Sequence, residues 1–289
     1  MAKPTIANVA ELAGVSQATV SRALRGATNV TEETRIKVQR AADQLNFTLS
    51  KSASALASGK TMRVILLVSG KLNEWFNSGV LQGVYEELAP VGYDVTPAFI
   101  TDRSELDRFF SQLPKSRNAD AIIISSFQLM PAMRDQLQAI DLPTVGVNVP
   151  AESGYFDASI SIDNSSAMTM AVRLLRSLGH TNIAFCSDYI PADMVYNTSQ
   201  RTQAFADAAQ ANATDGITFS LLTADAHDAP LSKSDLASQL TAKLLSLPER
   251  PTAVCVETDQ VAIALVKELR KQQPVSYTHL RAHETRRHL

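Results

Sequence analysis

The chain has 289 residues, of which 45% are hydrophobic and 19% charged, a composition typical of a globular protein with two or three domains. No apolar run is long enough to span a bilayer and the first ten residues lack the apolar core of a signal peptide, so we expect a cytoplasmic protein. The net charge of −2 is uneven: residues 1–60 hold eight Lys or Arg and four acidic residues, which favours a polyanion-binding segment, although chance scatter would give the same counts.

Two short helices joined by a tight turn are predicted over residues 6–24. The apolar residues of the first helix repeat at the spacing of one helix face, and Gly14 suits the left-handed backbone that ends a helix. Ser16 can cap the second helix, with Val20 and Leu24 on its inner face. The outer face then carries Gln17, Ala18, Ser21, Arg22 and Arg25. This is the helix-turn-helix arrangement, in which the second helix enters the major groove of DNA.

A third helix is predicted after Thr31, which can cap it, with an inner face of Val38, Ala42 and Leu45. The run VAELAGVSQATVSRAL, within residues 5–47, closely resembles the head of the lactose-repressor (LacI) family of bacterial transcription regulators. The resemblance continues to about residue 273. It implies a small all-α helix-turn-helix domain over residues 1–47, attached to an α/β body like that of periplasmic binding proteins.

The resemblance implies DNA contacts for particular head residues. Gln17, Ala18 and Arg22 would face base edges, where arginine is the usual bidentate reader of guanine. Arg25 would reach a phosphate by its charge. Hydroxyl side chains would bond further phosphates: Thr5, Ser16, Thr19, Ser21 and Thr34. Each residue taken singly fits a solvated helix face equally well, but their joint register favours DNA binding.

The Ser- and Ala-rich stretch over residues 48–61 has two interpretations. Leu56 is its only large apolar residue between Ser50 and Lys60, so it could be a flexible tether. The resemblance implies instead a hinge helix that folds on DNA, with Leu56 wedged into a minor-groove base step and Lys51 and Ala53 near phosphate and groove. At Leu49 and Ser50 the sequence departs from the Pro-Asn pair frequent in the family.

From Met62 onward, short apolar runs of strand length alternate with amphipathic helical stretches. The expected strands lie in 62–69, 93–100, 119–126, 142–149, 158–163, 181–187, 217–222 and 252–259. The expected helices lie in 77–92, from 103, after 131, over 164–178, around 201 and after 232. This alternation predicts parallel sheets with helices on both faces, and the length fits two Rossmann-like subdomains over about 62–160 and 161–273.

Several polar and aromatic residues follow the predicted strands, where ligands bind in such sheets. By resemblance they line an effector cleft suited to a sugar, with rings stacking on a pyranose and polar groups bonding its hydroxyls. These candidates are Trp75, Phe76, Ser125, Asn148, Asp163, Arg201, Thr258 and Asp259. Ser126 and Asn164 lie beside them. The alternative is structural: Trp75 and Phe76 would only pack, and Asp163 would only cap the next helix.

Signatures of catalysis are missing from the sequence. It has no phosphate-binding Gly loop, no G-x-S-x-G elbow and no zinc-spaced His/Cys cluster, so we expect no enzyme, no cofactor and no metal. Cys186 and Cys255 lie in apolar strand-like runs and are expected to be buried thiols. His180 follows a Gly at a helix end and is expected to belong to the helix cap.

The last residues, PVSYTHLRAHETRRHL (274–289), show no apolar periodicity and resemble an adapter-derived peptide rather than the family. We expect them to be non-native and the second subdomain to be incomplete, with an unpaired edge and exposed apolar surface. A metal-binding His tail is the alternative. Pro274 marks the approximate start of this tail.

The head, the linker and the cleft together predict a transcription regulator, expected to be a repressor. A homodimer would bind a pseudo-palindromic operator, associated with the bacterial nucleoid, and a small effector, expected to be a carbohydrate, would change its DNA affinity allosterically. Two alternatives remain. A sugar-binding transport protein would share the body, and a Rossmann-like enzyme would share the sheet but needs a catalytic constellation.

Overall fold

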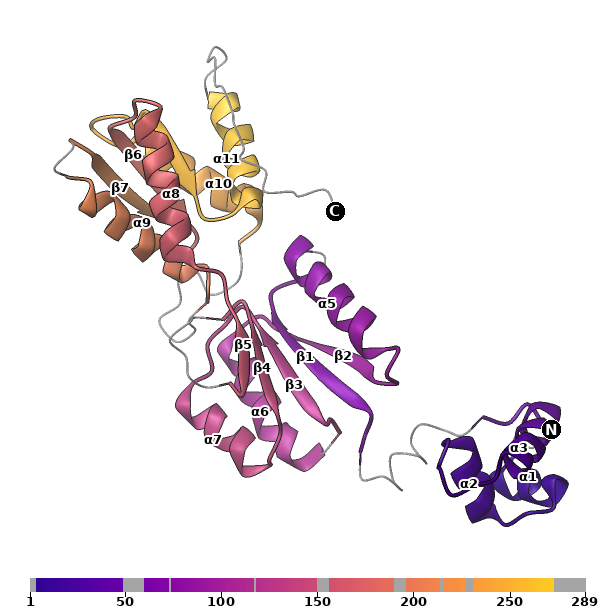
Figure 1. The fold of residues 1–289 in the computed structure, drawn as a ribbon. Helices are drawn as coiled ribbons and strands as arrows, with labels where there is room; N and C mark the ends of the chain where they lie inside the picture. Colours follow the sequence, from indigo (N-terminus) through magenta and orange to yellow (C-terminus); the bar gives the residue numbers. More distant parts are fainter. Residues whose placement is uncertain are drawn as a thin grey trace.

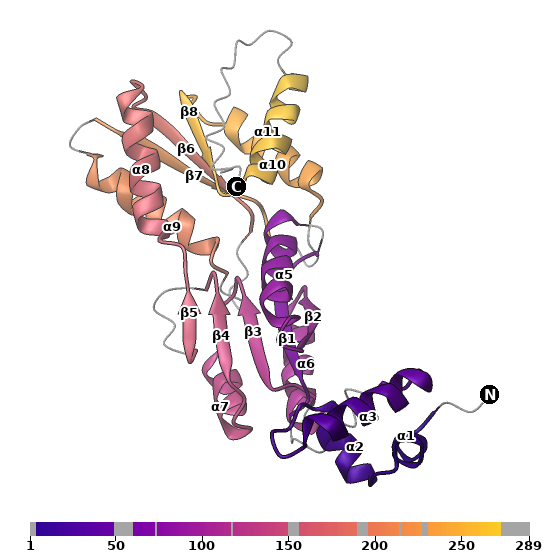
Figure 2. The same ribbon diagram turned by 45° about the vertical axis from the view of Figure 1, so that its right-hand side comes forward.

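The computed structural model describes residues 4–48, 60–72, 74–116, 118–149, 156–189, 196–213, 216–226 and 231–272. Figures 1 and 2 show a helical head and an α/β body made of two sheet-containing halves. The linker candidates Lys51, Ala53 and Leu56, and the tail over residues 274–289, lie outside the described residues.

Three helices form the head: α1 (Ile6–Ala13), α2 (Gln17–Leu24) and α3 (Glu32–Gln44). They enclose one core of seven buried residues, Val9, Ala10, Val20, Ala23, Val38, Ala41 and Ala42. The predicted corner between α1 and α2 is present, because Gly14 adopts the left-handed φ of 65° that ends α1. Ser16 Oγ then accepts the Thr19 backbone N–H at 3.1 Å and caps α2.

The first half of the body contains a parallel five-stranded sheet with the order β2-β1-β3-β4-β5. Its strands are β1 (Arg63–Ser69), β2 (Asp94–Ile100), β3 (Ala121–Ser125), β4 (Thr144–Val147) and β5 (Ala158–Ile160). Its helices are α5 (Trp75–Leu88), α6 (Arg103–Ser116) and α7 (Pro131–Ala139). Pro97, which cannot donate to a ladder, lies in the edge strand β2.

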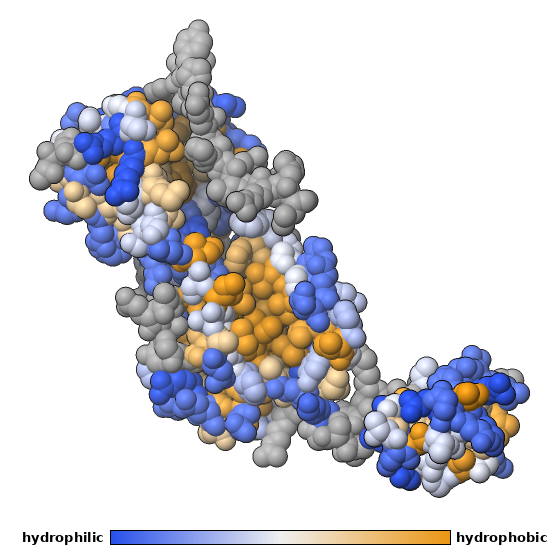
Figure 3. Space-filling view, in the orientation of Figure 1, coloured by the Kyte–Doolittle hydropathy of each residue, from blue (hydrophilic) through white to orange (hydrophobic). Residues whose placement is uncertain are grey.

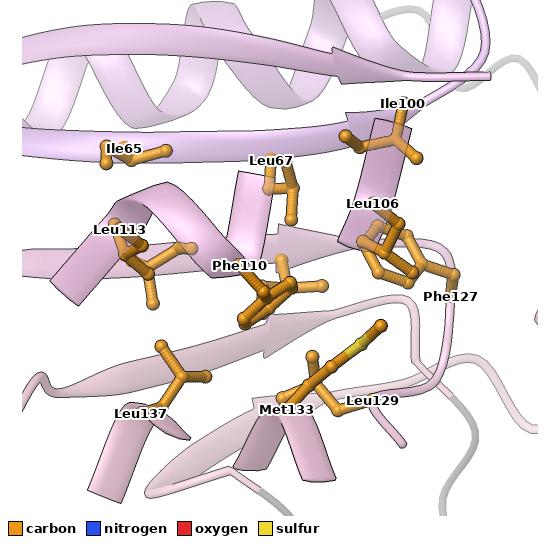
Figure 4. Packing of buried hydrophobic residues seen from close by; sticks show 12 residues of the cluster. Ile65, Leu67, Ile100, Leu106, Phe110, Leu113, Phe127, Leu129, Met133 and Leu137 are labelled. Carbon is orange, nitrogen blue, oxygen red and sulfur yellow. The ribbon is translucent and has the colours of Figure 1, made fainter. Parts of the chain in front are cut away.

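The two faces of this sheet are covered unequally. One face packs against α6 and α7 through a core that includes Leu67, Phe110 and Leu137 (Figure 4). On the other face lies α5, beside which Figure 3 shows a broad apolar area. Large side chains remain exposed at both ends of this face, including Phe99 (40%) on β2 and Ile160 (68%) on β5.

The second half contains a parallel three-stranded sheet with the order β7-β6-β8. Its strands are β6 (Asn182–Ser187), β7 (Thr218–Thr223) and β8 (Ala253–Val256). One apolar cluster joins it to α8 (Asn164–Ser177) and α9 (Ser199–Ala211), and another to α10 (Lys233–Leu245) and α11 (Asp259–Gln272). The predicted parallel sheets with helices on both faces are therefore confirmed. All four residues of the edge strand β8 are only half-buried, and Ile263 on α11 is 58% exposed.

The helix ends follow local capping chemistry. At the end of α8, Gly179 has a φ of 88° and the His180 backbone N–H donates to the Leu175 oxygen at 3.1 Å, as expected for a glycine cap. Helix α5 begins at Trp75, two residues before the predicted start. Within the described part of the chain, no helix is long and apolar enough to cross a membrane.

Candidate functional site

The exposed face of α2 carries the polar side chains that the sequence indicated. Gln17, Ala18, Arg22 and Arg25 are exposed, whereas Val20 and Ala23 are buried. Two intrahelical bonds hold the arginines along this face: Arg22 Nε donates to the Ala18 oxygen at 3.2 Å, and Arg25 Nη2 donates to Ser21 Oγ. The arrangement presents a short, basic and hydrogen-bonding helix surface to solvent.

The hydroxyl groups around α2 already have partners within the head. Thr5 forms a capping box with Asn8, whose N–H lies 3.4 Å from Thr5 Oγ1. Ser16 Oγ and Thr19 Oγ1 are 2.9 Å apart, and Thr34 Oγ1 lies 2.9 Å from the helix-capping hydroxyl of Thr31. Thr5 and Ser16 therefore cap helices, Thr19 and Thr34 bond cap hydroxyls, and the phosphate contacts of all four remain predictions.

Buried amides connect the two halves of the body. Asn148 follows β4, Asn164 begins α8 and Asn197 precedes α9, and all three are at least 93% buried. Asn164 Nδ2 donates to Asn197 Oδ1 at 2.6 Å, and Asn197 Nδ2 donates to Asn148 Oδ1. Because buried amides are costly without partners, this set fixes how the three segments meet.

The same chain of bonds extends in both directions. In the first half, Asn148 Nδ2 donates to Ser126 Oγ at 3.3 Å, and Ser126 Oγ lies 3.3 Å from Ser125 Oγ. In the second half, Arg201 Nε donates to Asn164 Oδ1 at 3.1 Å and Arg201 Nη1 donates to the Glu257 backbone oxygen at 2.5 Å. We call these linked side chains the polar chain: Ser125, Ser126, Asn148, Asn197, Asn164 and Arg201.

Backbone contacts reinforce this connection at the carboxyl ends of β3 and β4. Phe127 and Tyr196 form an isolated antiparallel bridge, and the Asn197 N–H donates to the Ser126 oxygen at 3.0 Å. Ser126 and Asn148 have left-handed φ values of 74° and 53°. Left-handed serine is uncommon and costs about 1 kcal/mol or more, and such strain concentrates at ligand-binding positions.

Charged groups cluster beside Arg201. Burial raises the pKa of Glu257 to about 7; the Asp188 charge adds to the rise, while an Asp188 N–H bond and the charges of Lys233 and Arg201 oppose it. Burial lowers the pKa of Arg201, and the charges of Glu257 and Asp259 partly offset this. Glu257 can therefore change its charge near neutral pH.

Four further candidates for effector binding lie outside the polar chain. Trp75 is 64% exposed and meets Phe76 edge-on, with ring centroids 5.8 Å apart. Asp163 is exposed and caps α8, and Ser166 hydrogen bonds lower the pKa of its carboxyl. Thr258 Oγ1 accepts the Val261 N–H at 3.4 Å. In the described residues no bond joins these four to the polar chain, so for Asp163 and Thr258 the structure shows the capping role.

Sequence reasoning missed two residues of this region. Asn197 stands in an irregular segment, and its amide partners lie 49 and 33 residues away in the chain. Glu257 lies within the strand expected over 252–259, although a carboxylate between the apolar run and Thr258 is a signal for a group at the sheet's carboxyl edge.

Cys186 is buried as expected, whereas Cys255 on the edge strand β8 is only half-buried. Cys186 and Cys255 are free thiols, and burial raises their pKa values to about 12 and about 11. No group of His, Cys, Asp and Glu within the described ranges could hold a metal ion.

Comparison with known proteins gives consistent matches. The family described as "Bacterial regulatory proteins, lacI family" matches residues 5–50, and "Periplasmic binding protein-like domain" matches residues 172–273. The transcriptional repressor PurR of Vibrio cholerae serotype O1 (strain M66-2) is 30% identical over 271 residues, which cover 93% of this chain and 77% of PurR.

Solved structures share the fold. The lac repressor dimer bound to operator and the anti-inducer ONPF aligns with a TM-score of 0.75 at 21% identity, covering 94% of this chain and 78% of that one. The complex of the transcriptional regulator CelR with cellobiose aligns with a TM-score of 0.56 at 24% identity, covering 93% of this chain and 78% of the CelR chain.

Proposed function

This chain belongs to the LacI family of bacterial regulatory proteins, and on that premise we propose that it represses transcription by binding a pseudo-palindromic operator as a homodimer. Family members are DNA-binding regulators rather than enzymes. We assign operator recognition to residues 1–47, linkage to 48–61, and effector binding and dimerisation to the two body halves, 62–160 and 161–273. Bound to its operator, the protein would lie with the nucleoid in the bacterial cytoplasm.

The observation that carries this proposal is the exposed polar face of α2 on a well-packed three-helix core. Arg22 projects from the side of α2 opposite its buried Val20, and Gln17 is exposed at the start of the helix. A major groove admits one helix, and an arginine bound to guanine contributes about 1–3 kcal/mol of base discrimination. Arg25 adds a charge for phosphate contact.

Selection of binding sites from random duplex DNA tests this reading. The full chain should enrich a palindrome, and Arg22→Ala should relax one position of each half-site. Arg40→Ala, which removes an exposed charge from α3, is the matched control and should weaken all sequences alike. Binding that weakens with salt but enriches no sequence would contradict an operator-specific repressor.

An apolar groove beside α5 supports the homodimer. Leu72, Leu81, Tyr85, Val95 and Pro97 line this groove of about 410 Å³ at the β2 edge of the first sheet. Tyr85 is 59% exposed and Leu72 is 41% exposed, as in an uncovered interface. We propose that a second copy of the chain covers it, since two-fold dimers are the commonest assembly and match a palindromic site.

The oligomeric state measured by sedimentation tests the groove. Tyr85→Lys should shift the protein towards monomer, because it buries a charge in the interface. Glu87→Lys changes the charge of an exposed residue on the same helix outside the groove and should leave the dimer intact. Equal dimerisation of both variants would exclude this groove as the dimer interface.

We propose that the polar chain and its neighbours bind a small carbohydrate that lowers operator affinity. Amides, Arg201 and Asp259 offer hydrogen bonds to hydroxyl groups, and Trp75 offers an exposed ring at the start of α5 for stacking. The relative that supports this class is CelR, solved with cellobiose.

Operator affinity in the presence of a panel of mono- and disaccharides, including cellobiose, tests the effector. One sugar should weaken operator binding. Asn197→Ala should reduce this weakening, because Asn197 connects the two halves, and should still bind the operator when no sugar is present. A panel that leaves affinity unchanged would refute a carbohydrate effector.

A further inference from the structure

One carboxylate fastens the start of the body. Asp120 stands at the amino end of β3, and its Oδ1 accepts the Thr61 backbone N–H at 2.7 Å and the Thr61 hydroxyl at 2.9 Å. Its Oδ2 accepts the Met62 backbone N–H at 2.9 Å. Three donors from two consecutive residues thus converge on a side chain 58 or more residues away in sequence.

The backbone on either side of these bonds is also fixed. The Asp94 N–H donates to the Met62 oxygen at 2.9 Å, and the Asp120 N–H donates to the Arg63 oxygen at 2.8 Å. Met62 itself has a φ of 52°, a left-handed conformation that costs an unbranched non-glycine residue about 1 kcal/mol. The Asp120 carboxylate therefore holds a chain turn that Met62 would not favour alone.

This turn lies where the linker proposed for residues 48–61 enters the first sheet. Because each peptide unit is planar, the bonds at Thr61 and Met62 fix the direction from which the chain enters the body at Lys60. A carboxylate gives stronger and more directional acceptors than a neutral group, which suits it to hold such a direction.

We propose that Asp120 is a positioning residue that fixes the direction in which the linker leaves the body, and so sets the spacing of the two DNA-binding heads. This inference rests on the proposed operator binding by a homodimer. Freed from Asp120, each head would sample more orientations, so the effective concentration of the second head at its half-site would fall. Affinity for the correctly spaced operator should drop by about tenfold, and tolerance of altered spacing should widen.

The full chain and three variants provide the first test. Asp120→Ala and Asp120→Asn are compared with Asp141→Asn, which removes the same charge from an exposed residue after α7 with a φ of 52° that asparagine tolerates. The probes are the palindrome selected by the wild-type chain and derivatives with one or two base pairs inserted at its centre. Wild type and Asp141→Asn should lose affinity sharply on insertion, and Asp120→Ala should show a weaker, flatter profile. A steep profile for Asp120→Ala would overturn the proposal.

Limited trypsin digestion gives a readout without DNA. Cleavage after Lys60 releases a body fragment that begins at Thr61, and mass spectrometry follows its appearance. Asp120→Ala should speed this cleavage several-fold, Thr61→Val, which removes only the hydroxyl donor, should speed it less, and Asp141→Asn should not change it. Equal rates in all variants would refute the anchoring role.

The two readouts separate failure of this inference from failure of the proposed function. A wild-type chain that selects no palindrome would refute operator binding, whereas the proteolysis rates would still decide whether Asp120 anchors the junction. If Asp120→Ala lowers the melting temperature of the whole chain, Thr61→Val replaces it in the comparison with wild type, provided that Thr61→Val leaves the melting temperature unchanged. Unchanged cleavage in that variant together with an unchanged spacing profile would then contradict the proposal.

Discussion

Arg201 on α9 donates from Nη1 to the backbone oxygen of Glu257, 2.5 Å away at the carboxyl end of β8. Its Nε bonds the amide of Asn164 at the start of α8, so one guanidinium connects two helices and a strand end. The planar fork of arginine allows both bonds at once.

Replacing Arg201 with lysine should separate effector response from DNA binding. Lysine keeps the charge but has no second nitrogen for Asn164, and loss of a bond to a charged group costs about 1.5–3 kcal/mol. We expect effector affinity to fall by about tenfold or more, with operator affinity in the absence of effector retained. Titration of both ligands checks this, and an Arg201→Lys protein that responds normally would remove Arg201 from the site.

Glu257 should make the stability of the body depend on pH. Its folded pKa of about 7 lies above the ordinary value of 4.5, so the folded state binds this proton more tightly. The associated stabilisation is complete below about pH 4.5 and is lost as pH rises to about 7, by at most about 3 kcal/mol.

Urea unfolding between about pH 5 and pH 7.5 measures this dependence. Glu257→Gln cannot titrate and should flatten the slope over this interval, whereas Glu249→Gln, at an exposed position, should behave as wild type. A slope that survives Glu257→Gln would assign the proton to another group.

Ser16→Asp should distinguish helix capping from phosphate contact. Aspartate caps a helix about as well as serine, so the head should keep its stability within about 0.5 kcal/mol. If Ser16 also faces a phosphate, the added negative charge should weaken operator binding by at least about tenfold. Ser232→Asp makes the same change at the cap of α10, which lies in the second half of the body. Equal DNA affinities of the two variants would leave Ser16 with the capping role only.

Gly146 and Gly79 should respond oppositely to alanine. A Cβ on Gly146 in β4 would lie 2.7 Å from Val149 Cγ2 and 2.9 Å from Phe156 Cδ2, so Gly146→Ala should cost about 1–3 kcal/mol through overpacking. Gly79 lies in α5 with nothing within 4 Å of its Cβ position, so Gly79→Ala should add up to about 1 kcal/mol. Thermal unfolding of both variants measures these two changes in stability. A destabilised Gly79→Ala protein would show that the face of α5 around Gly79 is covered.

The sequence predicts most of the fold because its signals are local. Gly14 and Ser16 define the corner of the head within three residues, and the alternation of strands and helices follows from apolar runs of different period. The polar chain could be predicted only in part. Ser125, Asn148 and Arg201 follow from their place at strand and helix ends, but the position of Asn197 depends on partners that only tertiary packing brings close.

The register of the strands has a consequence for synthesis. Contacts within the head stay inside residues 5–47, whereas β1 pairs with β3 some 57 residues later and α11 ends at Gln272. Local contacts form quickly and distant parallel pairings slowly. At about 5–20 residues per second, a ribosome would present a folded head about 10–45 s before the last described helix is made. During synthesis, each chain would thus have one folded DNA-binding head before its effector-binding body is complete. In that interval the head could meet DNA while no effector could yet bind.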